Sequence, residues 1–165
     1  MYKRQNCYKT PHSLGNDRIA LAVGATANFP KNNVLVIDAG TCITYDFINS
    51  KKEYLGGSIS PGIQMRYNAL HQFTSQLPLL ESVDTAMLTG ANTEGSIHSG
   101  IIKGVLVEID GIIKRYTNQY PDLKVIVTGG NARFFDKGLK NTIFANPNLL
   151  MEGLNKILDY NESYF

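Results

Sequence analysis

The sequence is poor in cysteine, in tryptophan and in charge. Its 165 residues include two cysteines, no tryptophan and 18% charged residues, against about 25% in a typical soluble domain. Cys7 and Cys42 stand far apart without a CxxC. This excludes a disulfide framework and a zinc site, and it is typical of a reducing, cytoplasmic location. The three histidines show no metal-ligand spacing either.

Long apolar runs and an excess of one charge are also missing. No run approaches the ~18 residues of a membrane span, and the N-terminus has no signal-peptide core, so neither a membrane nor export is expected. Sixteen basic and fourteen acidic residues leave a net charge of +2, too small and too scattered for a nucleic-acid surface. The 43% hydrophobic content excludes disorder and suffices for one domain, or for half of a two-lobed protein.

The apolar pattern predicts an α/β protein with a mixed sheet. A β-branched run at 34–37 indicates a buried strand, and it forms an antiparallel meander with strands expected at 42–49 and 54–59. Further segments are predicted as helices at 17–28, 62–73, 93–116 and 149–160, and as strands at 124–127 and 142–144. A meander followed by helix, strand and helix resembles the ribonuclease H-like lobe of actin, hexokinase and related kinases.

The helix expected at 93–116 carries Gly100 and Gly104. Each glycine costs about 1 kcal/mol against alanine in a helix interior. Their spacing suggests that another backbone packs closely there, such as that of a neighbouring subunit, although a tolerated irregularity also explains it. Thr89 or Thr93 can cap this helix, and Thr93 is nearest its start.

The strongest local motif is Asp38-Ala39-Gly40-Thr41-Cys42-Ile43-Thr44, between two expected strands. Gly40 allows the turn to approach a phosphate, backbone N–H groups in such a turn bind anions, and the Thr41 and Thr44 hydroxyls can donate to phosphate oxygens. Asp38 can hold a cation or its water shell. An ordinary β-hairpin turn explains the motif equally well.

Three further motifs contain glycine beside polar residues. In Gly15-Asn16-Asp17-Arg18, Asp17 is either a helix cap or a general base, and Arg18 is either a carboxylate anchor or a structural ion-pair partner. The segment Gly56–Gly62 reads as a wall that a small ligand approaches, or as a structural turn. The Gly129-Gly130 pair after a strand permits a flat base or ribose to lie against the backbone.

Taken in order, these motifs resemble the type III pantothenate kinase family, together with Tyr8-Lys9-Thr10-Pro11 before them and Asn92-Thr93 and Ser96-Ile97 after them. The resemblance runs from about Tyr8 to the C-terminus. It implies transfer of the γ-phosphate of ATP to the 4′-hydroxyl of pantothenate, the first step of coenzyme A biosynthesis. It also implies a cytoplasmic homodimer that uses a divalent metal, Mg²⁺ foremost, and a monovalent cation, K⁺ or NH₄⁺.

By this resemblance Asp17 is the catalytic base toward pantothenate. Tyr8, Gly15, Asn16, Arg18 and Thr93 belong to the pantothenate site, with Thr93 reaching the neighbouring subunit's pantothenate and Arg18 forming the pocket or supporting the dimer. ATP and its phosphates are expected at Gly40, Thr41, Thr44, Gly57, Gly129 and Gly130. Asp38 belongs to the second phosphate site and binds the monovalent cation.

The sequence departs from the family at its start. Members begin with an Asp-x-Gly-Asn-Thr motif that binds the triphosphate and the metal, and this motif is absent here. We therefore expect residues 1–33 to be a lead-in and linking helix left from a missing N-terminal lobe, with Met1–Asn6 a foreign start, and residues 34–165 to be the C-terminal lobe. The alternative function is a non-catalytic dimerising or ligand-binding module, including the family's older label of a transcriptional accessory factor. A retroviral-type aspartic protease is more remote, because its Asp-Thr/Ser-Gly loop differs.

Overall fold

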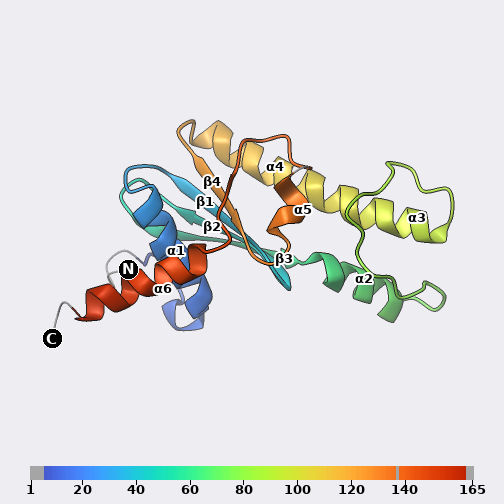
Figure 1. Cartoon of the computed structure of the whole chain (residues 1–165), viewed down its shortest axis with the longest axis horizontal. Coiled ribbons are helices and arrows are strands. Elements are labelled where there is room, and N and C mark those ends of the chain that lie inside the picture. The colour runs from blue at the N-terminus through green and yellow to red at the C-terminus, as the bar shows by residue number, and fades with distance from the viewer. Residues whose placement is uncertain (1–5, 137, 163–165) are drawn as a thin grey trace.

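A mixed five-stranded sheet forms the centre of the fold (Figure 1). The structure is a computed structural model that describes residues 6–136 and 138–162, so the expected foreign start lies outside the described residues except for Asn6. The strands follow one another in space in the order β3-β2-β1-β4-β5. Their bounds are β1 Val34–Ala39, β2 Cys42–Ile48, β3 Tyr54–Pro61, β4 Lys124–Thr128 and β5 Phe144–Ala145.

The predicted antiparallel meander is confirmed. β1 pairs antiparallel with β2, and β2 with β3, while β4 joins the other side of β1 in parallel and β5 follows β4 in parallel. Val34 to Ile37 are fully buried because β1 lies in the middle of the sheet with helices over both faces. This strand order and mixed pairing are those of a ribonuclease H-like lobe, as the pattern predicted.

Helices cover both faces of the sheet (Figure 1). α1 (Asn16–Asn28) and α6 (Leu149–Glu162) pack on one face, over a cluster that includes Val34, Val36 and Ile126. The other face carries α2 (Ile63–Gln72), α3 (Thr93–His98), α4 (Gly104–Gln119) and α5 (Ala132–Asp136), over the larger cluster. None of the described helices is long and apolar enough to cross a membrane.

The long helix predicted at 93–116 is present, but a π-helical turn interrupts it. The turn, Ser99–Lys103, joins α3 to α4 without a break in the chain's helical path. Its extra residue lets both Ile101 and Ile102 face the core, and the buried stripe continues through Val105 and Ile109 to Ile113. A π turn adds a residue that a regular helical period does not anticipate.

Close backbone packing at Gly100 and Gly104 is not found within the described chain. A side chain added at either position would have no other atom of the chain within 4 Å. The structure therefore offers no internal reason for these glycines, and their place in a subunit interface stays a prediction.

Three smaller features differ from the sequence analysis. α5 and a 3₁₀ turn at Pro11–Ser13 occur where only irregular chain was expected, since both are shorter than a periodic pattern can reveal. β3 extends to Pro61, and β5 lies at Phe144–Ala145 instead of 142–144. Asn92 caps α3 by accepting a hydrogen bond from Gly95 N, so the expected cap at Thr93 is wrong.

Candidate functional site

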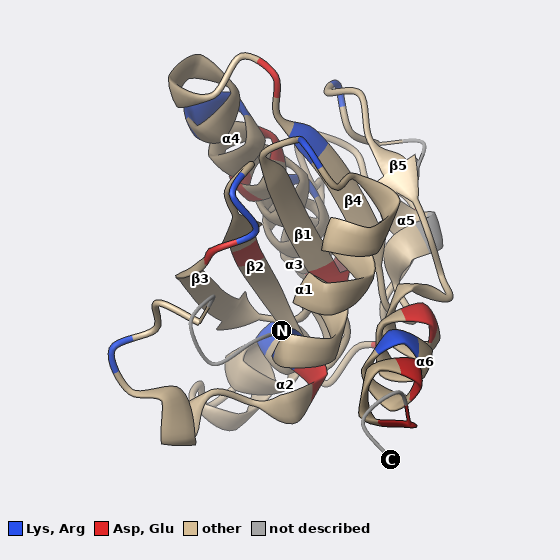
Figure 2. Cartoon of the chain, turned by 90° about the vertical axis from the view of Figure 1, so that its left-hand side faces the viewer, with Lys and Arg blue, Asp and Glu red and all other residues tan. Residues whose placement is uncertain are grey.

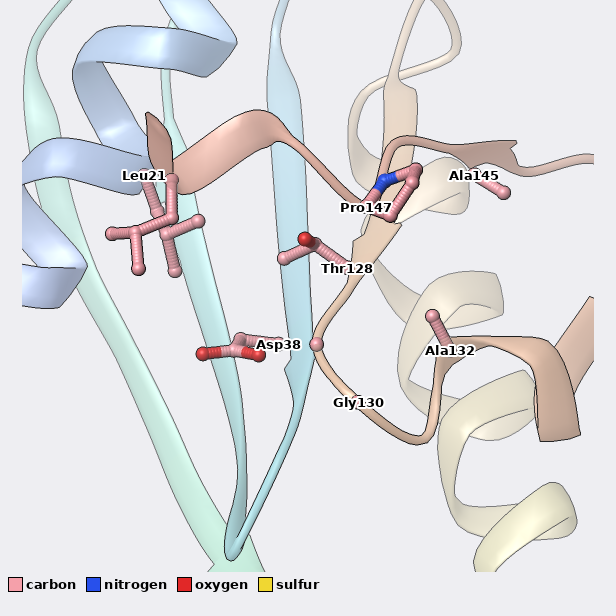
Figure 3. Close-up of a pocket in the computed structure, with 9 residues that line it drawn as sticks. Leu21, Asp38, Thr128, Gly130, Ala132, Ala145 and Pro147 are labelled. Carbon is pink, nitrogen blue, oxygen red and sulfur yellow. The ribbon is translucent and has the colours of Figure 1, made fainter. Parts of the chain in front are cut away.

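A cavity of about 590 Å³ lies over the carboxyl ends of β1 and β4 (Figure 3). These two parallel strands continue in opposite directions, to β2 on one side and to β5 on the other, which is where open α/β sheets bind ligands. Elements from both faces of the sheet edge contribute to the wall. The lining residues are Leu21, Asp38, Thr128, Gly129, Gly130, Ala132, Ala145, Pro147 and Leu150.

The turn after β4 forms one wall of this cavity. Gly129 has a φ of +92°, a conformation that favours glycine, and a side chain there would collide with Asp38 and the backbone of Ala39. Asn131 N donates to Ala39 O at 2.9 Å, which fastens the turn to the end of β1. The structure thus brings the predicted Gly129 and Gly130 beside the predicted Asp38.

Asp38 lines the cavity, and the charge of Asp17 acts on it, so we call these two residues the acidic pair. Asp38 ends β1 half-buried, and Asp17 is exposed in the first turn of α1. Burial raises the pKa of Asp38, and the negative charges of Asp17 and Asp46 raise it further. A carboxylate whose charge is this unfavourable gains from a nearby cation.

Arg18 is tied to a buried carboxylate on β2. Its Nε donates to Asp46 Oδ1 at 2.8 Å, and its Nη2 lies 2.7 Å from the same oxygen without forming a hydrogen bond. Tyr54 donates to Oδ1 at 2.6 Å and Thr44 to Oδ2 at 3.0 Å. Asp46 is fully buried, and breaking such a pair costs roughly 3–5 kcal/mol because it leaves an uncompensated charge.

This network bears on the roles predicted for Arg18 and Thr44. Arg18 makes a structural ion pair, the second of its two interpretations, and its place in the pantothenate site stays a prediction. Burial alone would lower the pKa of Arg18, but its hydrogen bond to Asp46 and the charge of Asp46 raise it. The Thr44 hydroxyl donates to Asp46, and its contact with a phosphate stays a prediction. The capping interpretation of Asp17 is also wrong, because no side chain caps α1 and Asp17 Oδ1 accepts from Arg18 N.

The other residues of the predicted pantothenate site lie around the start of α1. Gly15 precedes the helix, Asn16 begins it, and both are exposed. The Tyr8 ring packs against Tyr54, with ring centroids 6.0 Å apart, and lies against Gly56. Gly57 pairs with Asp46 in the sheet. The structure therefore gathers Tyr8, Gly57 and the first turn of α1 around the Arg18–Asp46 pair.

The turn between β1 and β2 has fewer free groups than predicted. Gly40 N donates to Cys42 O at 3.0 Å, so this N–H is not available to an anion. Thr41 is exposed, and its carbonyl accepts from Gly62 N at 3.1 Å. The Thr41 hydroxyl is what the turn offers to a phosphate.

Thr93 lies apart from all of these residues. It is exposed at the start of α3, at the opposite end of the molecule from α1 and α6 (Figure 1). Within one chain the structure does not bring Thr93 to Asp17.

Sequence reasoning missed Asp46 and Tyr54 as site residues. Thr44 and Asp46 alternate with apolar residues along β2, a pattern typical of a half-exposed strand, but α1 covers their face of the sheet. The apolar cavity wall of Leu21, Pro147 and Leu150 was also missed, because an isolated apolar residue carries no signature of a cavity. A charged residue in the middle of a strand was the available hint for Asp46.

The charges elsewhere are interspersed over helices and turns, with both signs on α6 (Figure 2). Among residues 6–136 and 138–162 there is no group of three or more histidine, cysteine, aspartate or glutamate side chains arranged to hold a metal ion. Mg²⁺ in phosphoryl-transfer sites is held by one or two carboxylates and by substrate phosphates. Asp38 supplies one such carboxylate at the cavity.

Comparison with known proteins identifies the relatives of this chain. A sequence model described as type III pantothenate kinase matches residues 2–115. The type III pantothenate kinase of Christiangramia forsetii is 52% identical over 159 residues, which are 96% of this chain and 65% of that protein. Those of Flavobacterium johnsoniae and Cytophaga hutchinsonii are each 52% identical, over 94% and 93% of this chain and 64% and 66% of their own length.

A solved structure shares the fold of this chain. The crystal structure of a protein described as a conserved putative Baf family transcriptional activator from Campylobacter jejuni superposes with a TM-score of 0.67 at 25% identity, over 93% of this chain and 67% of that one. The chain spans about 65% of the length of the curated relatives it matches. With this fold, these motifs and these relatives, the chain belongs to the type III pantothenate kinase family.

Proposed function

We propose that this chain carries the substrate and nucleotide sites of a kinase that transfers the γ-phosphate of ATP to the 4′-hydroxyl of pantothenate, the first step of coenzyme A biosynthesis. One observation carries the proposal. In a chain of this family, Asp38 lines a cavity at the carboxyl ends of two parallel strands, and the charge of Asp17, from a distant segment, acts on it.

Asp17 acts as the general base in this proposal. Its carboxylate accepts the proton of the 4′-hydroxyl as the hydroxyl oxygen bonds to the γ-phosphorus and the bond to the ADP oxygen breaks. Tyr8, Gly15 and Asn16 line the pantothenate site next to it. The Arg18–Asp46 ion pair supports this region by fastening the first turn of α1 to the sheet. Phosphoryl transfer depends mostly on such positioning and on charge neutralisation.

The nucleotide occupies the cavity between β1 and β4. Its adenosine lies against Gly129 and Gly130, and its phosphates extend toward Thr41, Gly40 and Gly57. Asp38 holds a monovalent cation, K⁺ or NH₄⁺, and the raised pKa of Asp38 supports this role. A divalent cation, Mg²⁺ foremost, supplies neutralisation of the phosphate charge when bound.

The working enzyme is a cytoplasmic homodimer in this proposal. Thr93 contacts the pantothenate bound by the neighbouring subunit, and its distance from the acidic pair within one chain supports an intersubunit role. Gly100 and Gly104 lie on the same helical run. Two unpaired cysteines are typical of a reducing compartment.

The test replaces the 159 matched residues of the Christiangramia forsetii relative with this chain and measures ADP release. We expect turnover that requires both pantothenate and ATP. Asp17→Asn should lower kcat by about 10²–10⁴-fold, the usual contribution of a general base, with the fold intact by circular dichroism. Asp84→Asn, in an exposed loop, is the matched control and should keep full activity. Near-normal turnover by Asp17→Asn would contradict the proposal.

A non-catalytic ligand-binding or dimerising module is the second candidate. The Campylobacter jejuni structure favours it, because that protein is described as a putative transcriptional activator. The same assay separates the two functions. Pantothenate binding by calorimetry without any ADP release would support the module.

A further inference from the structure

Arg66 on α2 holds together four segments of the fold. Its Nε donates to the Pro61 carbonyl at 2.9 Å, and its Nη2 donates to Ser60 Oγ at 2.9 Å and to Glu108 Oε2 at 2.6 Å. Glu108, on α4, also accepts a hydrogen bond from the Tyr45 hydroxyl of β2 at 2.9 Å. One guanidinium therefore joins the end of β3 to α2, to α4 and, through Glu108, to β2.

This cluster is partly buried, and its two charges are paired. The side chains of Arg66 and Glu108 are 22% and 27% exposed. Burial alone would raise the pKa of Glu108, but its hydrogen bonds, led by that from Arg66, lower it. Charge-assisted bonds of this geometry are roughly twice as strong as neutral ones, so the cluster holds its backbone contacts firmly.

The backbone that Arg66 fixes in turn supports the turn between β1 and β2. Immediately after Ser60 and Pro61, Gly62 N donates to the Thr41 carbonyl at 3.1 Å. Pro61 also pairs with Cys42 in the sheet, and Cys42 O accepts from Gly40 N. Two short paths of contacts thus lead from the guanidinium to the turn at Gly40 and Thr41.

We propose that Arg66 is a positioning residue for the phosphate-binding turn at Gly40–Thr41, acting through Ser60, Pro61 and Gly62. This inference rests on the proposed function, since it takes the phosphates of ATP to lie at that turn. In the competing interpretation, the Arg66–Glu108 ion pair only links α2 to α4 and stabilises all parts of the fold equally.

Lysine cannot take over this role. Arginine presents a planar fork of donors that bonds to the Pro61 carbonyl, Ser60 and Glu108 together, whereas an ammonium group is a point charge. Arg66→Lys therefore keeps the charge opposite Glu108 and loses the bonds to Pro61 and Ser60. Glu108→Gln is the second variant, which keeps the size of the side chain and releases the guanidinium. Arg115→Lys, at an exposed position of α4, is the matched control.

Amide hydrogen exchange of the full 165-residue chain tests the positioning directly. We expect Arg66→Lys and Glu108→Gln to speed exchange at Gly40 and Gly62 by about tenfold, the effect of one charge-assisted bond, while Val36 in the central strand keeps its wild-type rate. Unchanged exchange at Gly40 and Gly62 would overturn the proposal. An equal acceleration at Val36 would also overturn it, because this indicates general destabilisation.

Nucleotide binding tests the consequence. The same two variants should bind ATP about tenfold more weakly than the wild-type chain and adenosine within about twofold, because adenosine does not reach the turn. Equal losses for ATP and adenosine would overturn the inference. A wild-type chain that binds neither compound would contradict the proposed function instead, and hydrogen exchange would still decide the role of Arg66.

Discussion

Two carboxylates on the same face of the sheet, those of Asp46 and Asp38, differ in how their negative charge is compensated. Asp46 is fully buried, yet it receives hydrogen bonds from Arg18, Tyr54 and Thr44 that compensate its charge. Within residues 6–136 and 138–162 the Asp38 carboxylate accepts no comparable set of hydrogen bonds, and the nearby Asp17 repels it. A residue left in such an unfavourable state is a candidate for function because stability alone does not explain it.

The Asp38→Asn variant tests this state through the pH dependence of stability. Because burial and neighbouring charge raise the pKa of Asp38 in the folded protein, its ionised form destabilises the fold at neutral pH. The amide that replaces the carboxylate is neutral at every pH. We expect Asp38→Asn to raise Tm at pH 7, and the gain to shrink as the pH falls toward the ordinary aspartate value of 3.8.

Calorimetric melts in a buffer free of potassium and ammonium measure this effect, since a bound cation would offset the charge. Asp84→Asn, at an exposed loop position, should leave Tm unchanged. An equal gain at both ends of the pH range would show that the charge of Asp38 is not the cause.

At the scale of elements, the crossing helices α1 and α6 form one wall of the cavity. The helices meet backbone to backbone at Gly24 and Gly153, where an added side chain would run into the Leu149 or Ala20 carbonyl. This close approach places Leu21 of α1 and Leu150 of α6 on the same cavity wall. The shape of the nucleotide site in our proposal therefore depends on two glycines that lie outside the cavity lining.

Gly153→Ala tests the crossing. The new methyl group has no room beside the Ala20 carbonyl, and overpacking of this kind costs about 1–3 kcal/mol. We expect a lower free energy of unfolding in urea. Gly111→Ala is the matched control on α4, where an added methyl group meets nothing and should stabilise the helix by about 1 kcal/mol. Equal stability of the two variants would contradict the close crossing.

At the scale of the whole molecule, large apolar side chains are exposed at two separate ends. Phe73, Met87 and Leu88 are 79–80% exposed, and they belong to the chain between α2 and α3. Met151 and Leu158 are exposed on α6, at the other end of the molecule (Figure 1). Single exposed apolar side chains are common on protein surfaces, so of these two sets we assign the dimer contact to the one that leads to Thr93.

Self-association of the chain tests the proposed dimer. We expect the 165-residue protein to elute from a size-exclusion column above the mass of one chain. Leu88→Asp should shift it toward the monomer, because a charge in the segment that leads to Thr93 would oppose contact between subunits. Leu158→Asp on α6 is the matched control and should not. A wild-type monomer at micromolar concentration would count against the homodimer.

The amino-acid sequence by itself determined the meander, the long helix, the motifs around Asp17 and Asp38, and the resemblance to the family. These features are local, since strands and helices follow from alternation and period, and a motif is a run of neighbouring residues. For the same reason the sequence placed Gly129-Gly130 correctly after a strand.

Only the tertiary structure decided which charged side chains form ion pairs with each other. Arg18 and Asp46 are 28 positions apart and meet because α1 covers one face of β2. The same packing gave the Thr44 hydroxyl its partner Asp46 and brought Asp38 under the influence of the charge of Asp17. A side chain's partner depends on the packing of distant segments, and no pattern among neighbours in the sequence records that packing.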